Sequence, residues 1–293
     1  SLISSSIFLI LINYGYFNFV YLGNKKRILN YSENKYWQRE KCGLRGNLKY
    51  TSNKKNLDKA KESYKECWFR KSNQLNINQN LKSKKVFFYG NSYIEQLMPV
   101  PALINNNNNF NAFIVYYCDG MRNFSNEEED YYCKKNFNQY LDFFKNNSEK
   151  GDLFVFTTGS IYPSSSLSLY INELINLSKD LRAEGKRLVL ISRIPFLISN
   201  PDICSSSYSR TNQRCKVGVL FNKDQSAKQK LLEKEIAKLR ENDIIYIDIY
   251  TKLINKLSGD NKKIYVYYKN KNHLSREGAF LLTDYLKQNL EIK

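Results

Sequence analysis

The strongest constraint on the fold is an alternation of short apolar runs with longer amphipathic segments from residue 85 onward. Apolar residues recur at helical spacing between and after these runs, and an apolar strand buried on both faces is typical of a parallel sheet. The pattern predicts an α/β fold of three layers with a parallel sheet of about five strands. The expected strands are 85–89, 110–116, 153–157, 187–192 and 244–249, and the expected helices are 91–104, 128–146, 167–184, 222–241 and 275–290.

In such a fold, sites form at the carboxyl ends of the strands, and the first expected strand ends in Gly90-Asn91-Ser92. Ser92 is expected where the next helix begins, with its hydroxyl at the positive end of the helix dipole. Asn and Ser are also common helix N-caps, and this turn alone favours that structural role. The turn is therefore a candidate nucleophile site only if a second group supports it.

His273 is the only histidine, and it lies in a polar loop before the last expected helix. A single histidine is more often structural than catalytic. However, a neutral imidazole beyond the last strand could take the proton from a Ser hydroxyl as a general base. Ser92 and His273 together form a coherent pair of nucleophile and base.

Two tracts extend this interpretation: VFFYGNSYIEQLMP at 86–99 and NKNHLSREGA at 270–279. They resemble the Gly-Asp-Ser block and the terminal Asp-x-x-His-Leu-Ser-x-x-Gly-Ala block of the SGNH (GDSL-like) hydrolases. YYCDGM, LVLISRIP and the 204–215 loop are similar to the middle of the extracytoplasmic SGNH domain fused behind the membrane part of acyltransferase family 3 proteins. The resemblance covers most of the chain and implies a flavodoxin-like α/β/α fold.

Taken residue by residue, the resemblance implies that Ser92 is the nucleophile and His273 the general base, then the acid. Asn270 stands where the family has the Asp of the triad. A neutral amide can orient the imidazole by accepting a hydrogen bond from Nδ1, but it cannot stabilise an imidazolium by charge. The sequence leaves three alternatives open: reduced activity, a Ser-His dyad, or a substitute carboxylate such as Asp260. Ser275 is expected to cap the last helix.

Asn91 also replaces an Asp of the family pattern, and we expect that side chain mainly to shape the turn. The resemblance further implies an oxyanion hole made by the backbone N–H groups of Ser92, Gly120 and Gly159. The Asn that the family usually adds after the third strand is absent here. Both glycines are equally compatible with ordinary turns.

Six cysteines occur, and none forms the Cys-x-x-Cys pair that a zinc or thioredoxin-like site needs, so no metal and no cofactor is expected. Their even number and short intervals favour three local disulfides in an oxidising compartment. Other connectivities and buried reduced thiols remain alternatives. The favoured pairs are Cys42 with Cys67, Cys118 with Cys133, and Cys204 with Cys215.

The chain divides into three predicted parts. Residues 1–23 are uncharged and long enough to cross a bilayer, so we expect a transmembrane helix that ends a larger membrane region, with a buried core helix as the alternative. Residues 24–84 form a connector with 17 basic and 5 acidic residues, which is +12 of the total +18. Residues 85–293 form the SGNH-like domain.

The side of the membrane is indicated by two features that disagree. A Lys-Lys-Arg cluster at 25–27 would place the rest of the chain in the cytoplasm by the positive-inside rule. The paired cysteines favour a periplasmic or other extracytoplasmic location, and we give them more weight.

These expectations favour an O-acyltransferase domain, in which a membrane acyltransferase region supplies an acyl group, Ser92 carries it, and a polysaccharide hydroxyl accepts it. A secreted esterase would run the same chemistry with water as acceptor. A noncatalytic envelope- or carbohydrate-binding module is the third hypothesis. The positive charge lies mostly in the connector and no nucleic-acid-binding motif accompanies it, so nucleic acid is not an expected partner.

Overall fold

The computed structural model describes residues 42–44, 60–65, 67–69, 84–104, 109–115, 118, 127–157, 164–197, 201, 234–257 and 267–291. Within these residues a mostly parallel sheet forms the centre of the domain. Its five principal strands are β3 (Lys85–Gly90), β4 (Asn109–Val115), β5 (Leu153–Thr157), β6 (Arg187–Ile191) and β7 (Ile245–Ile247).

The strands lie in the order β4-β3-β5-β6-β7, and each of these neighbouring pairs is parallel. Numbered along the chain, this is the order 2-1-3-4-5 of flavodoxin-like folds. The direction of winding changes at β3, because β4 lies on one side of it and β5 on the other. The carboxyl end of β3 is therefore the topological switch point, where such sheets form their binding crevice.

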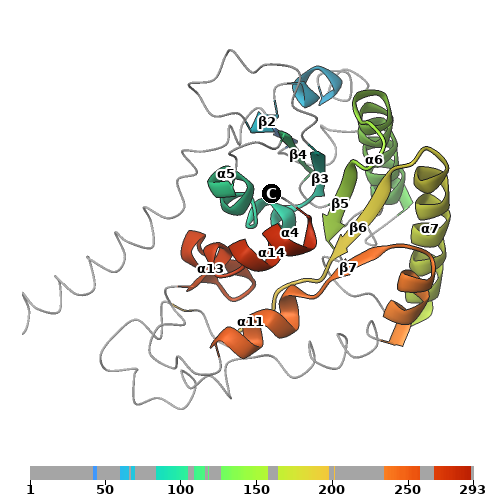
Figure 1. Ribbon diagram of the computed structural model, residues 1–293. Helices are drawn as coiled ribbons and strands as arrows, with labels where there is room; N and C mark the ends of the chain where they lie inside the picture. Colours follow the sequence, from blue (N-terminus) through green and yellow to red (C-terminus); the bar gives the residue numbers. More distant parts are fainter. Residues whose placement is uncertain are drawn as a thin grey trace, which may run out of the picture.

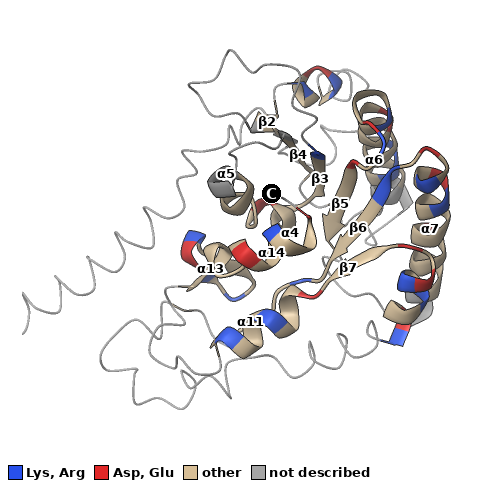
Figure 2. Ribbon diagram, viewed as in Figure 1, with Lys and Arg blue, Asp and Glu red and all other residues tan. Residues whose placement is uncertain are grey.

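Helices cover both faces of the sheet (Figure 1). One face carries α6 (Glu127–Asn147) and α7 (Ser164–Ala183), whereas α5 (Pro99–Ile104), α13 (Arg276–Phe280) and α14 (Thr283–Asn289) pack on one another over the opposite face. Many of the described Lys and Arg residues lie on helices such as α7 and α11 (Ile249–Leu257), and the middle of the sheet carries no charge (Figure 2). The three-layer α/β prediction is thereby confirmed.

The strands are buried on both faces, as their apolar sequences predict. Aromatic rings fill the space between the sheet and α6, with Phe87, Phe144 and Phe154 at mutual edge or tilted contacts. Their centroids lie 4.9 Å apart for Phe87 with Phe144 and 5.1 Å apart for Phe144 with Phe154. Aromatic pairs at such distances add to the stability provided by area burial alone.

Two described parts of the predicted connector belong to the sheet. Strands β1 (Gly43–Leu44) and β2 (Trp68–Phe69) both pair with β4, in parallel and antiparallel orientation respectively. Inside, Asn111 of β4 donates a hydrogen bond to the Tyr64 carbonyl at 2.8 Å and accepts one from the Tyr140 hydroxyl. This buried polar network ties residues 60–69 to the sheet and to α6.

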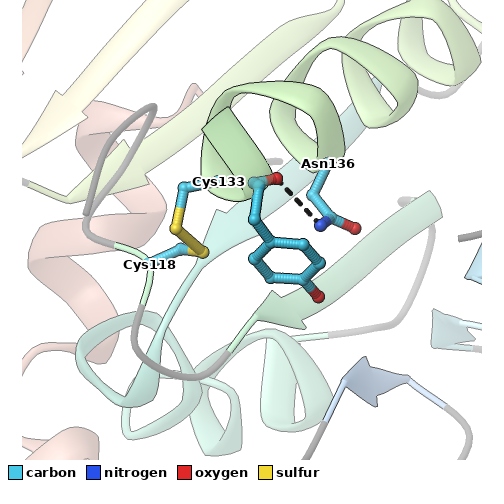
Figure 3. Close-up of a disulfide and its surroundings, with 4 residues drawn as sticks. Cys118, Cys133 and Asn136 are labelled. Carbon is cyan, nitrogen blue, oxygen red and sulfur yellow. Dashed lines mark hydrogen bonds between the residues drawn. A yellow bond between two sulfur atoms is a disulfide. The ribbon is translucent and has the colours of Figure 1, made fainter. Parts of the chain in front are cut away.

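The cysteine prediction has three outcomes. Cys118 and Cys133 form a disulfide that joins the segment after β4 to α6 (Figure 3). The predicted bridge between Cys42 and Cys67 is wrong, because both residues are buried thiols. Cys67 instead donates from Sγ to the Ser63 carbonyl at 3.0 Å. The apolar edge of β4 accommodates both side chains without a bridge, as the alternative of buried thiols anticipates. The predicted pair at 204 and 215 lies outside the described residues.

The expected helices differ from the observed ones at prolines and turns. The segment 91–104 divides into α4 (Ser92–Glu95) and α5, which begins at Pro99, because proline has no N–H for a helix interior. The segment 275–290 divides into α13 and α14, and α11 begins only two residues after β7 and was not predicted. In the described ranges, no helix combines the length and apolar character of a membrane span, and the predicted span 1–23 lies outside them.

Candidate active site

The nucleophile turn is built by a helix cap and a close packing contact. Asn91 has extended backbone angles, and its Oδ1 accepts a hydrogen bond from the Tyr93 N–H at 2.9 Å. Asn91 is therefore the N-cap of α4, and Ser92 is the first helical residue. A Cβ at Gly90 would lie 2.6 Å from Cγ1 of Ile94, so glycine lets the helix turn back closely against the strand. The Ser92 side chain is not used to cap the helix.

A short hairpin carries the second and third candidate residues. Strands β8 (Tyr268–Asn270) and β9 (His273–Leu274) are antiparallel, and a two-residue turn joins them. Ser275 caps α13 by accepting from the Gly278 N–H at 3.1 Å, as the sequence predicts, although α13 is only the first half of the expected helix. A Cβ at Gly278 would lie 2.0 Å from the Tyr267 carbonyl oxygen, so a side chain cannot fit there.

The fold brings Ser92 and the hairpin that carries His273 together at the carboxyl end of β3. His273 Nε2 lies 2.8 Å from Ser92 Oγ, across 181 positions of sequence. On the other side of the ring, Nδ1 lies 3.0 Å from Asn270 Oδ1. The three residues therefore form a continuous Ser-His-Asn series of hydrogen bonds.

The proton positions follow from the partners of Asn270. Its Oδ1 also accepts from the backbone N–H of Asn272 at 3.0 Å, which identifies that atom as the amide oxygen. An amide oxygen can only accept, so Nδ1 of His273 carries the proton and donates to it. The neutral ring then has a lone pair on Nε2, and Ser92 donates its hydroxyl proton to that atom. This is the tautomer that a general base needs.

The environment keeps the imidazole neutral. Burial is the main cause that lowers the pKa of His273 from 6.5 to about 4, and the nearby positive charge of Lys269 adds to it. The ring is thus unprotonated at neutral pH and can accept a proton from Ser92. The charge of an imidazolium would have no compensating carboxylate at position 270, because the residue there is an amide.

Aromatic residues beside the ring were not foreseen from the sequence. Tyr93 stacks on His273, with centroids 5.5 Å apart and planes inclined by 13°, and on Phe196, at 5.9 Å and 12°. The guanidinium of Arg193 lies 5.3 Å from the centroid of the Phe196 ring. Arg193 and Phe196 lie in the segment after β6, and the position of this segment at the carboxyl end of a predicted strand was a sequence feature that pointed to it.

The loop after β6 is tied to the hairpin by two hydrogen bonds. The Tyr268 hydroxyl donates to the Pro195 carbonyl at 2.8 Å, and the Leu197 N–H donates to the Lys271 carbonyl at 2.7 Å. These bonds join the β6 and β8 segments into one wall of the candidate site.

The predicted oxyanion donors are only partly described. Ser92 is the first residue of α4, so its N–H belongs to the turn whose donors have no acceptor within the helix. Gly120, Gly159 and the substitute carboxylate Asp260 lie outside the described residues. Their roles stay predictions from the sequence.

Comparison with known proteins agrees with this architecture. The family model for the SGNH domain fused to AT3 domains matches residues 50–288. The chain therefore belongs to this family of SGNH domains. No curated protein matches the chain in sequence.

One solved structure shares the fold at low sequence identity, and a second gives a weaker match. The periplasmic domain of a lipopolysaccharide acetyltransferase from Salmonella ser. Paratyphi A has a TM-score of 0.56 and 16% identity. That match covers 71% of this chain and 84% of the other. A putative SGNH hydrolase from Slackia heliotrinireducens has a TM-score of 0.47 and 13% identity, over 71% of this chain and 99% of the other.

Proposed function

We propose that this chain is an O-acyltransferase domain that transfers an acyl group, acetyl in the simplest case, to sugar hydroxyls of a cell-envelope polysaccharide. The observation that carries the proposal is the 2.8 Å contact between Ser92 Oγ and Nε2 of a neutral His273. A general base needs this reach, about 2.6 to 3.2 Å, to the proton that it removes. Asn270 is the third member, which holds the proton on Nδ1.

The proposed reaction has two balanced halves. In the first, the Ser92 proton moves to His273 Nε2, Oγ attacks the acyl carbonyl carbon, and the donor leaves with the proton from Nε2. In the second, His273 takes the proton of a sugar hydroxyl, the sugar oxygen attacks the acyl-Ser92 ester, and Oγ leaves with the proton. The products are an acylated sugar and a regenerated Ser92.

The negative oxygen of each tetrahedral intermediate needs hydrogen-bond donors. We assign these to the backbone N–H of Ser92, at the start of α4, and to the N–H groups of Gly120 and Gly159.

The choice of donor and acceptor rests on the family. SGNH domains of this kind are fused to AT3 domains, which suggests that a membrane acyltransferase region provides the acyl group. The Salmonella neighbour belongs to a lipopolysaccharide acetyltransferase, which suggests a polysaccharide acceptor and a periplasmic setting. The disulfide is consistent with an oxidising, extracytoplasmic compartment. Anchoring through residues 1–23 is part of the same proposal.

The test is mass spectrometry of the purified protein during reaction with p-nitrophenyl acetate. We expect an acetyl adduct on Ser92 that is absent from Ser92→Ala and forms far more slowly in His273→Ala. Ser168→Ala, an exposed serine on α7, is the matched control and should acylate as the wild type does. An adduct that persists in Ser92→Ala, or no adduct in the wild type, contradicts the proposal.

A second measurement separates transfer from hydrolysis. With an oligosaccharide present in excess, the acyltransferase forms an acetylated sugar, whereas an esterase releases only acetate. Acetate alone, with an acetyl adduct still on Ser92, would replace the transferase by the esterase that runs the same acyl-enzyme chemistry.

A further inference from the structure

Gln96 connects the two halves of the candidate site. This residue is the C-cap of α4, four positions after Ser92, and its side-chain Oε1 accepts a hydrogen bond from the Leu274 N–H at 2.7 Å. Leu274 is the residue directly after His273, so the bond joins the nucleophile helix to the histidine strand across 178 positions of sequence. The other end of the amide, Nε2, donates to the Tyr93 carbonyl at 3.2 Å.

The two bonds require an amide in this place. The Leu274 N–H is a donor, so the atom that faces it must accept, and the Tyr93 carbonyl is an acceptor, so the atom that faces it must donate. A glutamine satisfies both groups with one planar side chain. A glutamate satisfies the first group only, and an apolar side chain of the same length satisfies neither.

The hairpin that carries His273 has few bonds of its own. Strand β9 has two residues, and its pairing with β8 is interrupted by an irregularity between Tyr268 and Asn270. Its contacts with α4 are the Ser92 bond to the ring, the stacking of Tyr93 on the ring, and the Gln96 bond to the backbone. Of these three, only the Gln96 bond holds the main chain that sets the position of the ring.

We propose that Gln96 is a positioning residue for the acyl-transfer reaction, because it clamps the backbone beside His273 to the helix that begins with Ser92. The inference rests on the proposed function for its catalytic consequence. Catalytic groups must be held within about 0.5 Å of the productive geometry. A displacement of about 1 Å can lower the rate by about 100-fold.

The experiment uses the fact that His273 is the only histidine, so its two ring nitrogens give unambiguous ¹⁵N signals. In the wild type we expect a protonated Nδ1 and an unprotonated Nε2. Gln96→Met keeps the length and removes both hydrogen bonds, so the two ¹⁵N shifts should move toward each other as the second tautomer becomes populated. Gln96→Glu keeps the acceptor for Leu274 and should retain the wild-type tautomer.

Kinetics with p-nitrophenyl acetate provide the second readout. We expect Gln96→Met to lower kcat by about 10- to 100-fold with little change in KM, in line with a misplaced base. Gln96→Glu should recover most of this loss. Gln288→Met, on the exposed face of α14, is the matched control and should leave the ¹⁵N shifts and kcat unchanged.

The outcomes distinguish this inference from the proposed function. Wild-type ¹⁵N shifts and wild-type kcat in Gln96→Met overturn the inference. If no protein acylates but the ring signals still change in Gln96→Met and are kept in Gln96→Glu, the clamp stands and the proposed function fails. If Gln96→Met does not fold, Gln96→Asn, which is too short to reach Leu274, is expected to give the same changes, and wild-type behaviour there overturns the inference.

Discussion

Replacing Asn270 by Asp should convert the Ser-His-Asn series into a charged triad and make the site more active. Asn270 Oδ1 lies 3.0 Å from Nδ1 and is already oriented by the Asn272 N–H, so the new carboxylate needs no rearrangement. Only the charge changes. The substitution therefore isolates the electrostatic contribution of the third residue from its role in orienting the ring.

The magnitude follows from Coulomb's law. Two unit charges about 4 Å apart interact by about 4 kcal/mol at an effective dielectric constant of about 20, which corresponds to about 3 pKa units. Asn270 is only partly buried, so solvent screens part of this interaction energy, and the carboxylate of the new Asp loses some hydration. We expect the pKa of His273 to rise from about 4 by about 1 to 2 units. Stabilisation of the imidazolium in the transition state by the same amount raises kcat/KM by about 10- to 100-fold.

Two assays check this prediction. A ¹⁵N or ¹H NMR titration follows the single histidine directly, and the pH dependence of kcat/KM reports the same group in the free enzyme. The wild-type rate should rise as the pH increases through about 4 and then remain level, and in Asn270→Asp the midpoint should move upward. Asn146→Asp, an exposed residue of α6, adds the same charge elsewhere and serves as control. A His273 pKa that is unchanged or lower in Asn270→Asp would refute the reasoning.

Three further predictions follow from the described geometry. Gly278→Ala places a Cβ against the Tyr267 carbonyl, so the hairpin must move. The free energy of unfolding should fall by about 1 to 3 kcal/mol, and the rate of acylation should fall with it. An unchanged denaturation midpoint would contradict this. His273 binds a proton more weakly in the folded state than in the unfolded state, so its stabilising contribution is present above pH 6.5 and is lost as the pH falls toward about 4. The melting temperature should therefore depend less on acid pH in His273→Gln than in the wild type. Identical pH profiles of the melting temperature would argue against a depressed pKa. Alkylation of unfolded, unreduced protein should label Cys42 and Cys67 but neither Cys118 nor Cys133. The double substitution Cys118→Ser with Cys133→Ser should lower the free energy of unfolding by about 3 kcal/mol for a loop of this length. Labelling of Cys118 before reduction would disprove the bridge.

The strands of the sheet could be predicted closely because their sequences leave little choice. The run 153–157 matches β5 at both ends, and 187–192 differs from β6 by one residue. A strand with helices on both faces is apolar at most positions, which distinguishes it from the surrounding segments. Helix ends were predicted less well, and α11 is an example. It begins where Asp248 accepts a hydrogen bond from the Thr251 N–H, and the apolar pattern does not reveal such a cap.

The pair Ser92 and His273 could be predicted because each lies in a recognisable tract and each lies close to the start of a predicted helix. Their partners could not. Gln96, Tyr93 and Phe196 have ordinary residue types in ordinary positions. Nothing in a local sequence pattern states that Tyr93 stacks on His273, that Phe196 stacks on Tyr93, or that Gln96 accepts a hydrogen bond from the Leu274 N–H. Hydrogen bonds and ring contacts between distant segments depend on packing, which local propensities do not encode.

By itself, the sequence determined the layers of this protein, the strand ends where its candidate site lies, and the identity of the candidate nucleophile and base. These properties follow from periodicity and residue type, which act over a few residues. Only the tertiary structure decided that Asn270 hydrogen-bonds to His273, that Gln96 hydrogen-bonds to the backbone of the hairpin, and that Cys42 and Cys67 stay unbridged. The physical reason is that each of these depends on distances between atoms far apart in the chain, which are set when the whole core packs.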